Sequence, residues 1–486
     1  MQILRIALRQ LVYLYSLKQT HYLLGILIIL FFTSCYIVLV LNRYWQFEYF
    51  YTDNVHFDSV IWKVSRGLEP VIHHSRLGDI NKLGDHFSPT IFLLSPLYWF
   101  TIKQEVILVA SAVLYGLSAI LAMQIGFKLV KSRIETFSLL VAYFLYLGTQ
   151  NAFIYGFHEV NLMPLFFMLM LIGFFYKKIV VFSVALILLL LTKESLVFVV
   201  IGFALFIIIS GKANRILGEI LVFISLLYYV IVTGFLIPYF SRGHFFYTEI
   251  PIPSLYDIFH RLWYPTEKLS TIFISLATFG FLPILNLTTL PLLFSDFIIR
   301  YLFSVEGLVT YRLVYHYNLV VAPILFFSSV YTVYLLQKKF AKSIAVLVVS
   351  IVLINIYLNV FRYQRGPILL VFNPGFYQTT VNNEFLWKFV DKVPKTGSIM
   401  TQNHLGYAFS HQPVYLFPSK TWHFPSINTD YIVVDLRLGQ NANNYFPIGE
   451  ELLRELIPDL IKSNRYDIFY SNGTQYILKK SISKTI

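Results

Sequence analysis

The sequence predicts a polytopic α-helical membrane protein that ends in a small C-terminal α/β domain. Three observations support this fold class. The 486 residues are 57% hydrophobic and only 13% charged, whereas soluble domains average about 45–50% apolar and about 25% charged residues. Apolar runs of about 17 residues or more recur through the first three quarters of the chain, as in transmembrane helices. From residue 362 onward the composition becomes that of a soluble domain.

The transmembrane domain is expected to occupy residues 1–361 and to contain about eleven spans. Their predicted positions are 21–41, 105–128, 134–151, 160–176, 179–192, 194–210, 216–238, 269–287, 290–303, 314–336 and 343–361. The apolar run 87–100 is only about 14 residues long and contains Pro89 and Pro96. It is therefore expected to lie along the membrane surface or to dip into it, not to cross it.

The net charge of +13 is interpreted as membrane topology and not as nucleic-acid binding, because Lys and Arg mark cytoplasmic loops. With the N-terminus inside, every basic cluster in a short loop falls on one side: Arg5, Arg9 and Lys18; Lys128, Lys131 and Arg133; Lys177 and Lys178; Lys212 and Arg215; Lys338, Lys339 and Lys342. We therefore expect an integral plasma (cytoplasmic) membrane protein with its C-terminal domain outside. The single cysteine, Cys35, excludes a disulfide or a cysteine metal site within one chain.

The C-terminal domain, residues 362–486, is expected to be non-cytoplasmic. Helical spacing predicts a helix over 382–393, and short apolar runs predict strands at 398–402, 414–418 and 431–436. An amphipathic helix is expected over 449–463, interrupted by Pro458. Residues 466–480 are expected to form a hairpin around the Asn472-Gly473 turn signal.

The first outer loop, residues 42–104, contains the stretch YTDNVHFDSVIW (51–62). Its two acids, Asp53 and Asp58, are candidate catalytic residues, since a carboxylate can take a proton from an attacking hydroxyl. On a helix they would be about 140° apart, so they would not share one face. Asp53 is also a candidate helix N-cap, which is compatible with catalysis.

Further ionisable residues are expected on the same outer face, at the ends of apolar runs. Such groups are costly near a membrane and are usually functional, so we expect them to form one site. The candidates for substrate or phosphate binding are Asp85, His86, His158, Glu159, Lys193, Glu194 and His316.

Each of these candidates also has a structural alternative. The Asp85-His86 pair precedes the run 87–100 and can hold a phosphate or a divalent ion, or simply form a turn. A metal at Asp53, Asp85 and His86 stays open, and no other cofactor is indicated. A zinc helix at His158-Glu159 is disfavoured, because the second His of HExxH is missing at Leu162.

Lys193 can neutralise a lipid phosphate, or Glu194 can simply pair with it. His316 lies between Tyr315 and Tyr317, which suit a membrane-interface belt. No single one of these sequence patterns is specific. The prediction of one site depends on their shared side of the membrane.

The order of the polar stretches resembles an uncharacterised family of predicted membrane proteins from bacteria and archaea, which itself resembles the GT-C glycosyltransferase superfamily. The similar stretches cover residues 45–440 and are DNVHFDSVIW (53–62), Gly67, HFSP (86–89), FHEV (157–160), KES (193–195), LPILNLTTLPLLF (282–294) and YHY (315–317). The chain departs from the family pattern at Asn54-Val55, where the family has Leu-Gly, and at Ser59, where it has Gln.

This resemblance implies a GT-C-like fold and a specific reaction. A polyprenyl-phosphate sugar would present its headgroup at the non-cytoplasmic face, and an acceptor of unknown nature (glycan, lipid or protein) would attack it with inversion. Asp53 would be the base, with Asp58 second. Lys193, His86 and His316 would stabilise the leaving phosphate, and residues 87–100 would line a groove for the lipid tail.

Two interpretations from other classes remain. A transporter or flippase of a lipid-linked or polar solute would need ionisable groups in mid-span and often shows repeats, neither of which is visible here. A non-catalytic assembly protein would use the outer α/β domain to bind partners. A cleft that joins Asp53, Asp85 and Lys193 would favour the enzyme over a transporter, which needs a cavity near the membrane midplane.

Overall fold

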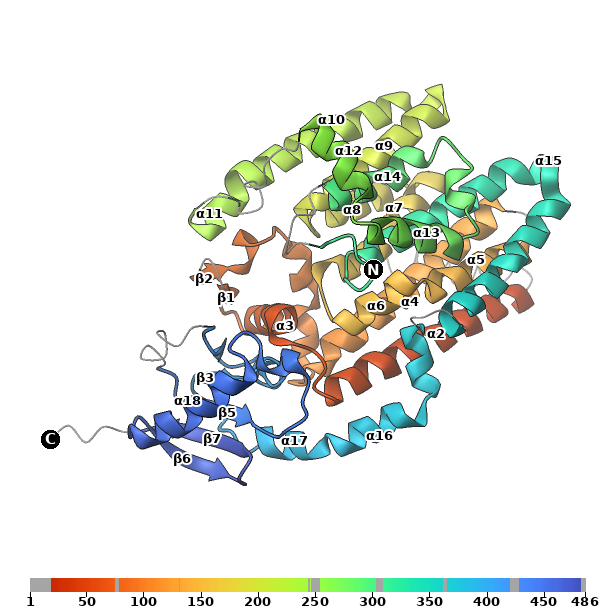
Figure 1. Ribbon diagram of the computed structural model, residues 1–486. Helices are drawn as coiled ribbons and strands as arrows, with labels where there is room; N and C mark the ends of the chain where they lie inside the picture. The colour runs from red at the N-terminus through yellow and green to blue at the C-terminus, as the bar shows by residue number, and fades with distance from the viewer. Residues whose placement is uncertain are drawn as a thin grey trace.

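Helices fill the first three quarters of the chain (Figure 1), and the computed structural model describes residues 19–74, 78–130, 132–243, 245, 254–302, 309–361, 365–419 and 428–481. Within these residues, five helical stretches are long and apolar enough to cross a membrane: Thr20–Trp45, Glu105–Leu129, Arg133–Tyr155, Lys212–Ser241 and Asn318–Gln337. Four shorter apolar helical stretches accompany them: Glu159–Phe175, Ile179–Leu190, Glu194–Ser210 and Val346–Val360. The expected count of about eleven spans is therefore not confirmed.

Most helices of this region follow one another closely, and residues 66–104 form the longest connection. Their bounds are α2 (Gln19–Trp45), α3 (Tyr51–Ser65), α4 (Glu105–Leu129), α5 (Arg133–Leu145), α6 (Leu147–Tyr155), α7 (Met163–Phe175), α8 (Ile179–Leu190), α9 (Val197–Ser210), α10 (Arg215–Ile231), α11 (Ile237–Ser241), α12 (Leu255–Trp263), α13 (Glu267–Thr278), α14 (Leu290–Leu302) and α15 (Asn318–Val360). The predicted break between 336 and 343 appears as a non-helical residue, Phe340, inside α15. The basic residues Arg5, Arg9, Lys18 and Lys131 lie outside the described residues, as do the side chains of Lys338 and Lys342.

Short 3-10 turns begin two of the shorter apolar stretches. The turns η3 (Glu159–Leu162) and η4 (Glu194–Leu196) precede α7 and α9, so that the α-helices themselves begin later. The run 87–100 forms a 3-10 helix, η2 (Pro89–Trp99), and is not among the stretches long enough to span. Pro96 inside η2 has no N–H for an α-helical hydrogen bond.

The C-terminal region forms a five-stranded mixed sheet in the order β4-β3-β5-β7-β6. Its strands are β3 (Ile399–Thr401), β4 (Val414–Leu416), β5 (Tyr431–Asp435), β6 (Tyr466–Ser471) and β7 (Gln475–Lys480), and its helices are α16 (Pro374–Asn382), α17 (Glu384–Val390) and α18 (Glu450–Lys462). The prediction that Pro458 interrupts the last helix is wrong. The helix α18 continues through Pro458 because Leu456, Ile457 and Leu460 bury their side chains in the core of this region.

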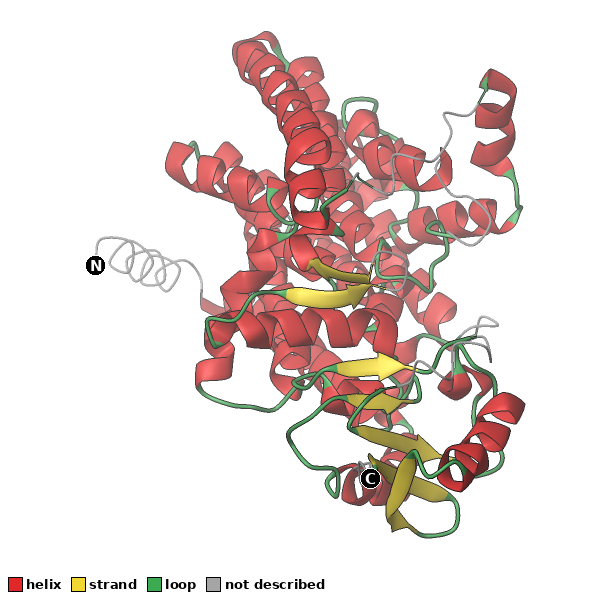
Figure 2. Cartoon of the chain, turned by 90° about the vertical axis from the view of Figure 1, so that its left-hand side faces the viewer, coloured by secondary structure: helices red, strands yellow, loops and turns green. Residues whose placement is uncertain are grey.

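The sheet lies at one end of the molecule, as Figure 2 shows. Figure 1 places α3 and the small hairpin of β1 (Val71–His74) and β2 (Gly78–Asn81) next to it. Hydrogen bonds join the two regions. The hydroxyl of Tyr51 donates to the carbonyl of Val414 at 2.7 Å, and the backbone N–H of Tyr51 donates to Asn403 Oδ1 at 3.0 Å. The side chain of Gln104 donates to the carbonyl of Ala408 at 3.3 Å. The first turn of helix α3 and the residue before α4 are therefore held against the C-terminal region.

The buried His404 gives the C-terminal region a pH-dependent stability. Burial lowers the pKa of His404 to about 4, so between about pH 6.5 and pH 4 the unfolded chain binds a proton that the folded chain does not. The free energy of unfolding should therefore fall as the pH is lowered through this window. Unfolding measured by intrinsic fluorescence at pH 4.5 and pH 7 should show a smaller difference in His404→Asn than in the wild type. An equal difference in both proteins would contradict this assignment.

Candidate functional site

Helix α3 carries the two candidate acids in different directions, as their spacing predicts. The Asp53 side chain is 39% exposed, accepts a hydrogen bond from the Tyr155 hydroxyl at 3.3 Å, and has its Oδ2 3.4 Å from His158 Nε2. Asp58 is only 1% exposed and accepts hydrogen bonds from the hydroxyls of Tyr98 and Ser410. The structure therefore places Asp53 beside the other candidate residues and Asp58 against the C-terminal region.

Asn54, where the sequence departs from the family pattern, positions the FHEV stretch next to Asp53. Its side-chain oxygen accepts from the N–H of Phe157 at 3.1 Å, and its side-chain nitrogen donates to the carbonyl of Tyr155 at 3.3 Å. Between these two residues lies Gly156, with a φ of +117°, which favours glycine. A Cβ on Gly156 would also lie 1.9 Å from the Asn54 oxygen. These two hydrogen bonds of Asn54 hold the segment before His158 against α3.

His158 and His316, from segments that are far apart in sequence, stack with their ring centroids 3.5 Å apart. Burial, with further contributions from His158 and Lys193, lowers the pKa of His316 well below its usual value. Burial tends to raise the pKa of Asp53, but His158, followed by His56 and Lys82, lowers it to about 2. At neutral pH the site therefore holds an ionised carboxylate and a neutral His316.

Lys193 is the buried cation of the predicted set. It forms an ion pair with Glu159 at 2.5 Å, and its ammonium lies 5.6 Å from the centre of the Tyr317 ring. The side chain of Glu159 is 1% exposed and that of Lys193 is 7% exposed. Because Glu159 follows His158 directly in the chain, this ion pair continues the polar cluster that begins at Asp53.

The GDHFSP stretch docks on the turn that contains Lys193 and Glu194. His86 Nδ1 lies 2.7 Å from Glu194 Oε1, and the N–H of Phe87 donates to the other oxygen of Glu194 at 3.2 Å. Asp85 forms a 2.6 Å ion pair with Lys82. Lys82 is in turn close enough to Asp53 to lower its pKa. The structure thus brings eight of the nine predicted site residues into one cluster, with Asp58 as the exception.

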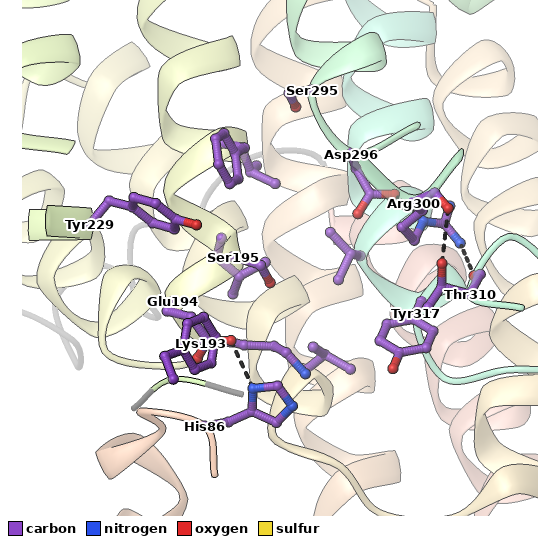
Figure 3. Close-up of a pocket in the computed structure, with 16 residues that line it drawn as sticks. His86, Lys193, Glu194, Ser195, Tyr229, Ser295, Asp296, Arg300, Thr310 and Tyr317 are labelled. Atoms are coloured by element: carbon purple, nitrogen blue, oxygen red, sulfur yellow. Dashed lines mark hydrogen bonds and ion pairs between the residues drawn. The ribbon is translucent and has the colours of Figure 1, made fainter. Parts of the chain in front are cut away.

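Two cavities adjoin this cluster. The first, called the cation cavity, has a volume of about 250 Å³ and is lined by Lys193, His86, Tyr317 and the apolar side chains of Phe198 and Val320 among others. Figure 3 shows Lys193 and His86 on one side of it and Arg300 and Tyr317 on the other. The second, called the junction cavity, has a volume of about 590 Å³ and includes Asp53 and Tyr155. The segments 155–160 and 315–317 contribute to the walls of both cavities.

Sequence reasoning missed two buried cations. Arg300 lines the cation cavity, pairs with Asp296 at 2.6 Å and is 6% exposed, and its Nη2 donates to no atom of the described residues. The sequence does contain a signal for Arg300. Asp296 and Arg300 are two charged residues four positions apart in an apolar run, and such charges are usually functional. Lys82, which is 3% exposed, lies in a polar loop that gives no such signal. Within the described ranges, no group of three or more His, Cys, Asp or Glu side chains is arranged to hold a metal ion.

Comparison with family models identifies the family of the chain. The model of the family described as "Predicted membrane protein (DUF2079)" matches residues 43–476. No curated protein matches the chain.

Proposed function

Because the chain belongs to the DUF2079 family of predicted membrane proteins, and because its polar cluster joins two cavities of different chemistry, we propose that it is a membrane glycosyltransferase. It transfers a sugar from a polyprenyl-phosphate donor to an acceptor at the non-cytoplasmic face of the plasma membrane, with a GT-C-like arrangement of helices. The continuous cluster of Asp53, His158, Glu159 and Lys193 is the observation that carries this proposal.

The cation cavity suits the phosphate of a lipid carrier. Its walls combine apolar side chains, such as Leu196, Phe198 and Val199, with the charged residues Lys193, Arg300, Glu194 and Asp296. Apolar walls accommodate the first isoprene units, and buried cations stabilise the charge that develops on a leaving phosphate. The unpartnered Nη2 of Arg300 provides a donor that no described protein group uses.

Asp53 is the base in this proposal. An acceptor hydroxyl attacks the anomeric carbon as the bond from that carbon to the phosphate oxygen breaks, which inverts the configuration and releases polyprenyl phosphate. The hydroxyl proton passes to the Asp53 carboxylate. A carboxylate with a pKa of about 2 is a weak base, but the negative charge of a bound phosphate raises its pKa. Asp53 then accepts the proton late, as the new bond forms.

The reaction requires the two cavities to communicate. The stacked rings of His158 and His316 lie between Asp53 and the Lys193–Glu159 pair. The donor sugar therefore has to pass these rings, or displace them, to reach Asp53.

The proposal is tested by assaying the purified protein in lipid nanodiscs with a set of radiolabelled polyprenyl-phosphate sugars and membrane extract as the source of acceptor. We expect label to move from the lipid fraction to a second product, together with the release of polyprenyl phosphate. Binding of the lipid without any transfer would instead favour a transporter of lipid-linked solutes. If neither binding nor transfer occurs, the proposal is wrong.

Replacing Arg300 by Gln is expected to weaken binding of polyprenyl phosphate by about 10- to 100-fold, the usual effect of losing hydrogen bonds to a charged group. Native mass spectrometry of the nanodisc sample measures the bound lipid phosphate. Arg215→Gln is the matched control, because Arg215 also pairs with an acid four residues away, at an exposed site. Arg300→Lys retains the charge, so its binding of polyprenyl phosphate should be weaker than in the wild type but stronger than in Arg300→Gln. Equal binding by Arg300→Gln and the control would remove Arg300 from the lipid site.

A further inference from the structure

The junction cavity is shared between the helical region and the C-terminal region. The helical region contributes Arg43, Asp53, Asn151 and Tyr315 to its lining, and the C-terminal region contributes Asn443 and Phe446. Its volume of about 590 Å³ lies within the range of small-molecule sites, about 300–1,000 Å³. A ligand held there would touch both regions at once.

The polar groups of this cavity can both donate and accept hydrogen bonds. The amides of Asn151 and Asn443 each offer two donors and one acceptor, and within the described chain neither side chain is engaged in a hydrogen bond. Asp53 adds an acceptor, and the Tyr315 hydroxyl adds a group that does both. A ligand rich in hydroxyl groups matches this mixture, because each of its hydroxyls also donates and accepts.

The charges of the cavity argue against an anionic ligand. Among the described residues that line it, the one cation, Arg43, is paired with Glu48 at 3.2 Å. Asp53 adds a further negative charge, so the lining carries a net negative charge at neutral pH. A phosphate is favoured in the cation cavity and disfavoured here.

Aromatic side chains complete the lining. Phe446 is 55% exposed, which is costly for an apolar ring unless another surface covers it. Phe50 and Tyr155 also line the cavity. The C–H face of a sugar ring is apolar and packs on an aromatic ring, while the hydroxyls at its edge bond to amides and carboxylates. Of neutral ligands, a carbohydrate fits this combination of amides and aromatic rings.

We infer that the junction cavity is a carbohydrate-binding site, with Asn151, Asn443 and Phe446 as its specificity-determining residues. Sugar binding itself follows from this lining alone. The further statement that the bound sugar is the acceptor of the reaction, with its hydroxyl at Asp53, rests on the proposed function. It names the acceptor as a glycan or a glycolipid headgroup, since the C-terminal region contributes contacts that a bare lipid could not use.

Saturation-transfer NMR tests this inference on the full-length protein in nanodiscs, which avoid the sugar headgroups of maltoside detergents. The probes are glucose, galactose, mannose, N-acetylglucosamine, maltose and lactose. We expect at least one of them to receive saturation from the wild-type protein. In the variants Asn443→Ala and Phe446→Ala, the saturation-transfer signal of that sugar should fall by about fivefold or more, the effect of losing one neutral contact. Asn214→Ala, in an exposed turn outside the cavity, should leave the signal unchanged.

The outcomes separate this inference from the proposed function. If no sugar of the panel receives saturation, or if the cavity variants bind as the wild type does, the carbohydrate site is refuted. Sugar binding that depends on Asn443, in a protein that transfers nothing from any polyprenyl-phosphate sugar, would support the site and contradict the enzyme. If the protein transfers sugar, binds no sugar of the panel and is unaffected by Asn443→Ala, the enzyme is supported and the carbohydrate site is contradicted.

Discussion

Replacing Asp53 by Asn is expected to lower the turnover of sugar transfer by about 10²- to 10⁴-fold, the usual contribution of a positioned general base. The amide has the shape of the carboxylate but cannot take the proton of the acceptor hydroxyl. Because the side chain is 39% exposed and makes only long contacts with Tyr155 and His158, the variant should fold and accumulate as the wild type does. The loss should therefore appear in kcat at saturating donor.

Membranes with matched amounts of protein and labelled polyprenyl-phosphate sugars provide the measurement. Asp459→Asn, an identical change at an exposed position of α18, is the control and should leave turnover unchanged. Asp53→Glu should recover part of the activity, since it retains a base in a shifted position. Wild-type turnover by Asp53→Asn would exclude Asp53 from the chemistry.

Replacing Lys193 by Met is expected to destabilise the protein by about 3–5 kcal/mol, because it leaves the carboxylate of Glu159 buried without its cation. It should also abolish transfer, since the leaving phosphate loses a positive charge. The exposed pair of Lys388 and Glu384 is the matched control, and Lys388→Met should cost about 1 kcal/mol or less. Thermal unfolding in nanodiscs compares the two variants.

The double variant Lys193→Met/Glu159→Leu separates stability from chemistry. Replacing both members of a buried ion pair by apolar residues is often neutral or stabilising, so the double variant should regain most of the lost stability. It should still fail to transfer sugar. Full activity in the double variant would show that Lys193 acts only as the partner of Glu159. Wild-type stability in the single variant would contradict the buried ion pair.

The cluster could be predicted from membrane topology, although no single residue pattern was specific. The prediction places Asp53, His158, Lys193 and His316 on one outer face because an odd number of predicted spans precedes each of them. The membrane then confines them to a thin layer, where few arrangements keep them apart. The predicted count of about eleven spans is not confirmed, because stretches such as Glu194–Ser210 are apolar but shorter than the five long stretches of the described residues.

Contacts between distant segments could not be predicted. The partners of Asp58 at Ser410 and His411 are about 350 positions away, and nothing in the local sequence connects them. Asn54 is a departure from the family pattern, and its side chain holds the turn at Gly156. Its role depends on a backbone that is about 100 residues away, and it is visible only in three dimensions.

Helix α3 mechanically couples the two halves of the molecule. One side of it bears the carboxylate that contacts His158, and the other bears Asp58, whose hydrogen bonds reach into the C-terminal sheet region. Because α3 is a single helix, a rotation that moves Asp58 also moves Asp53. Any displacement of the sheet would therefore also move Asp53 relative to His158.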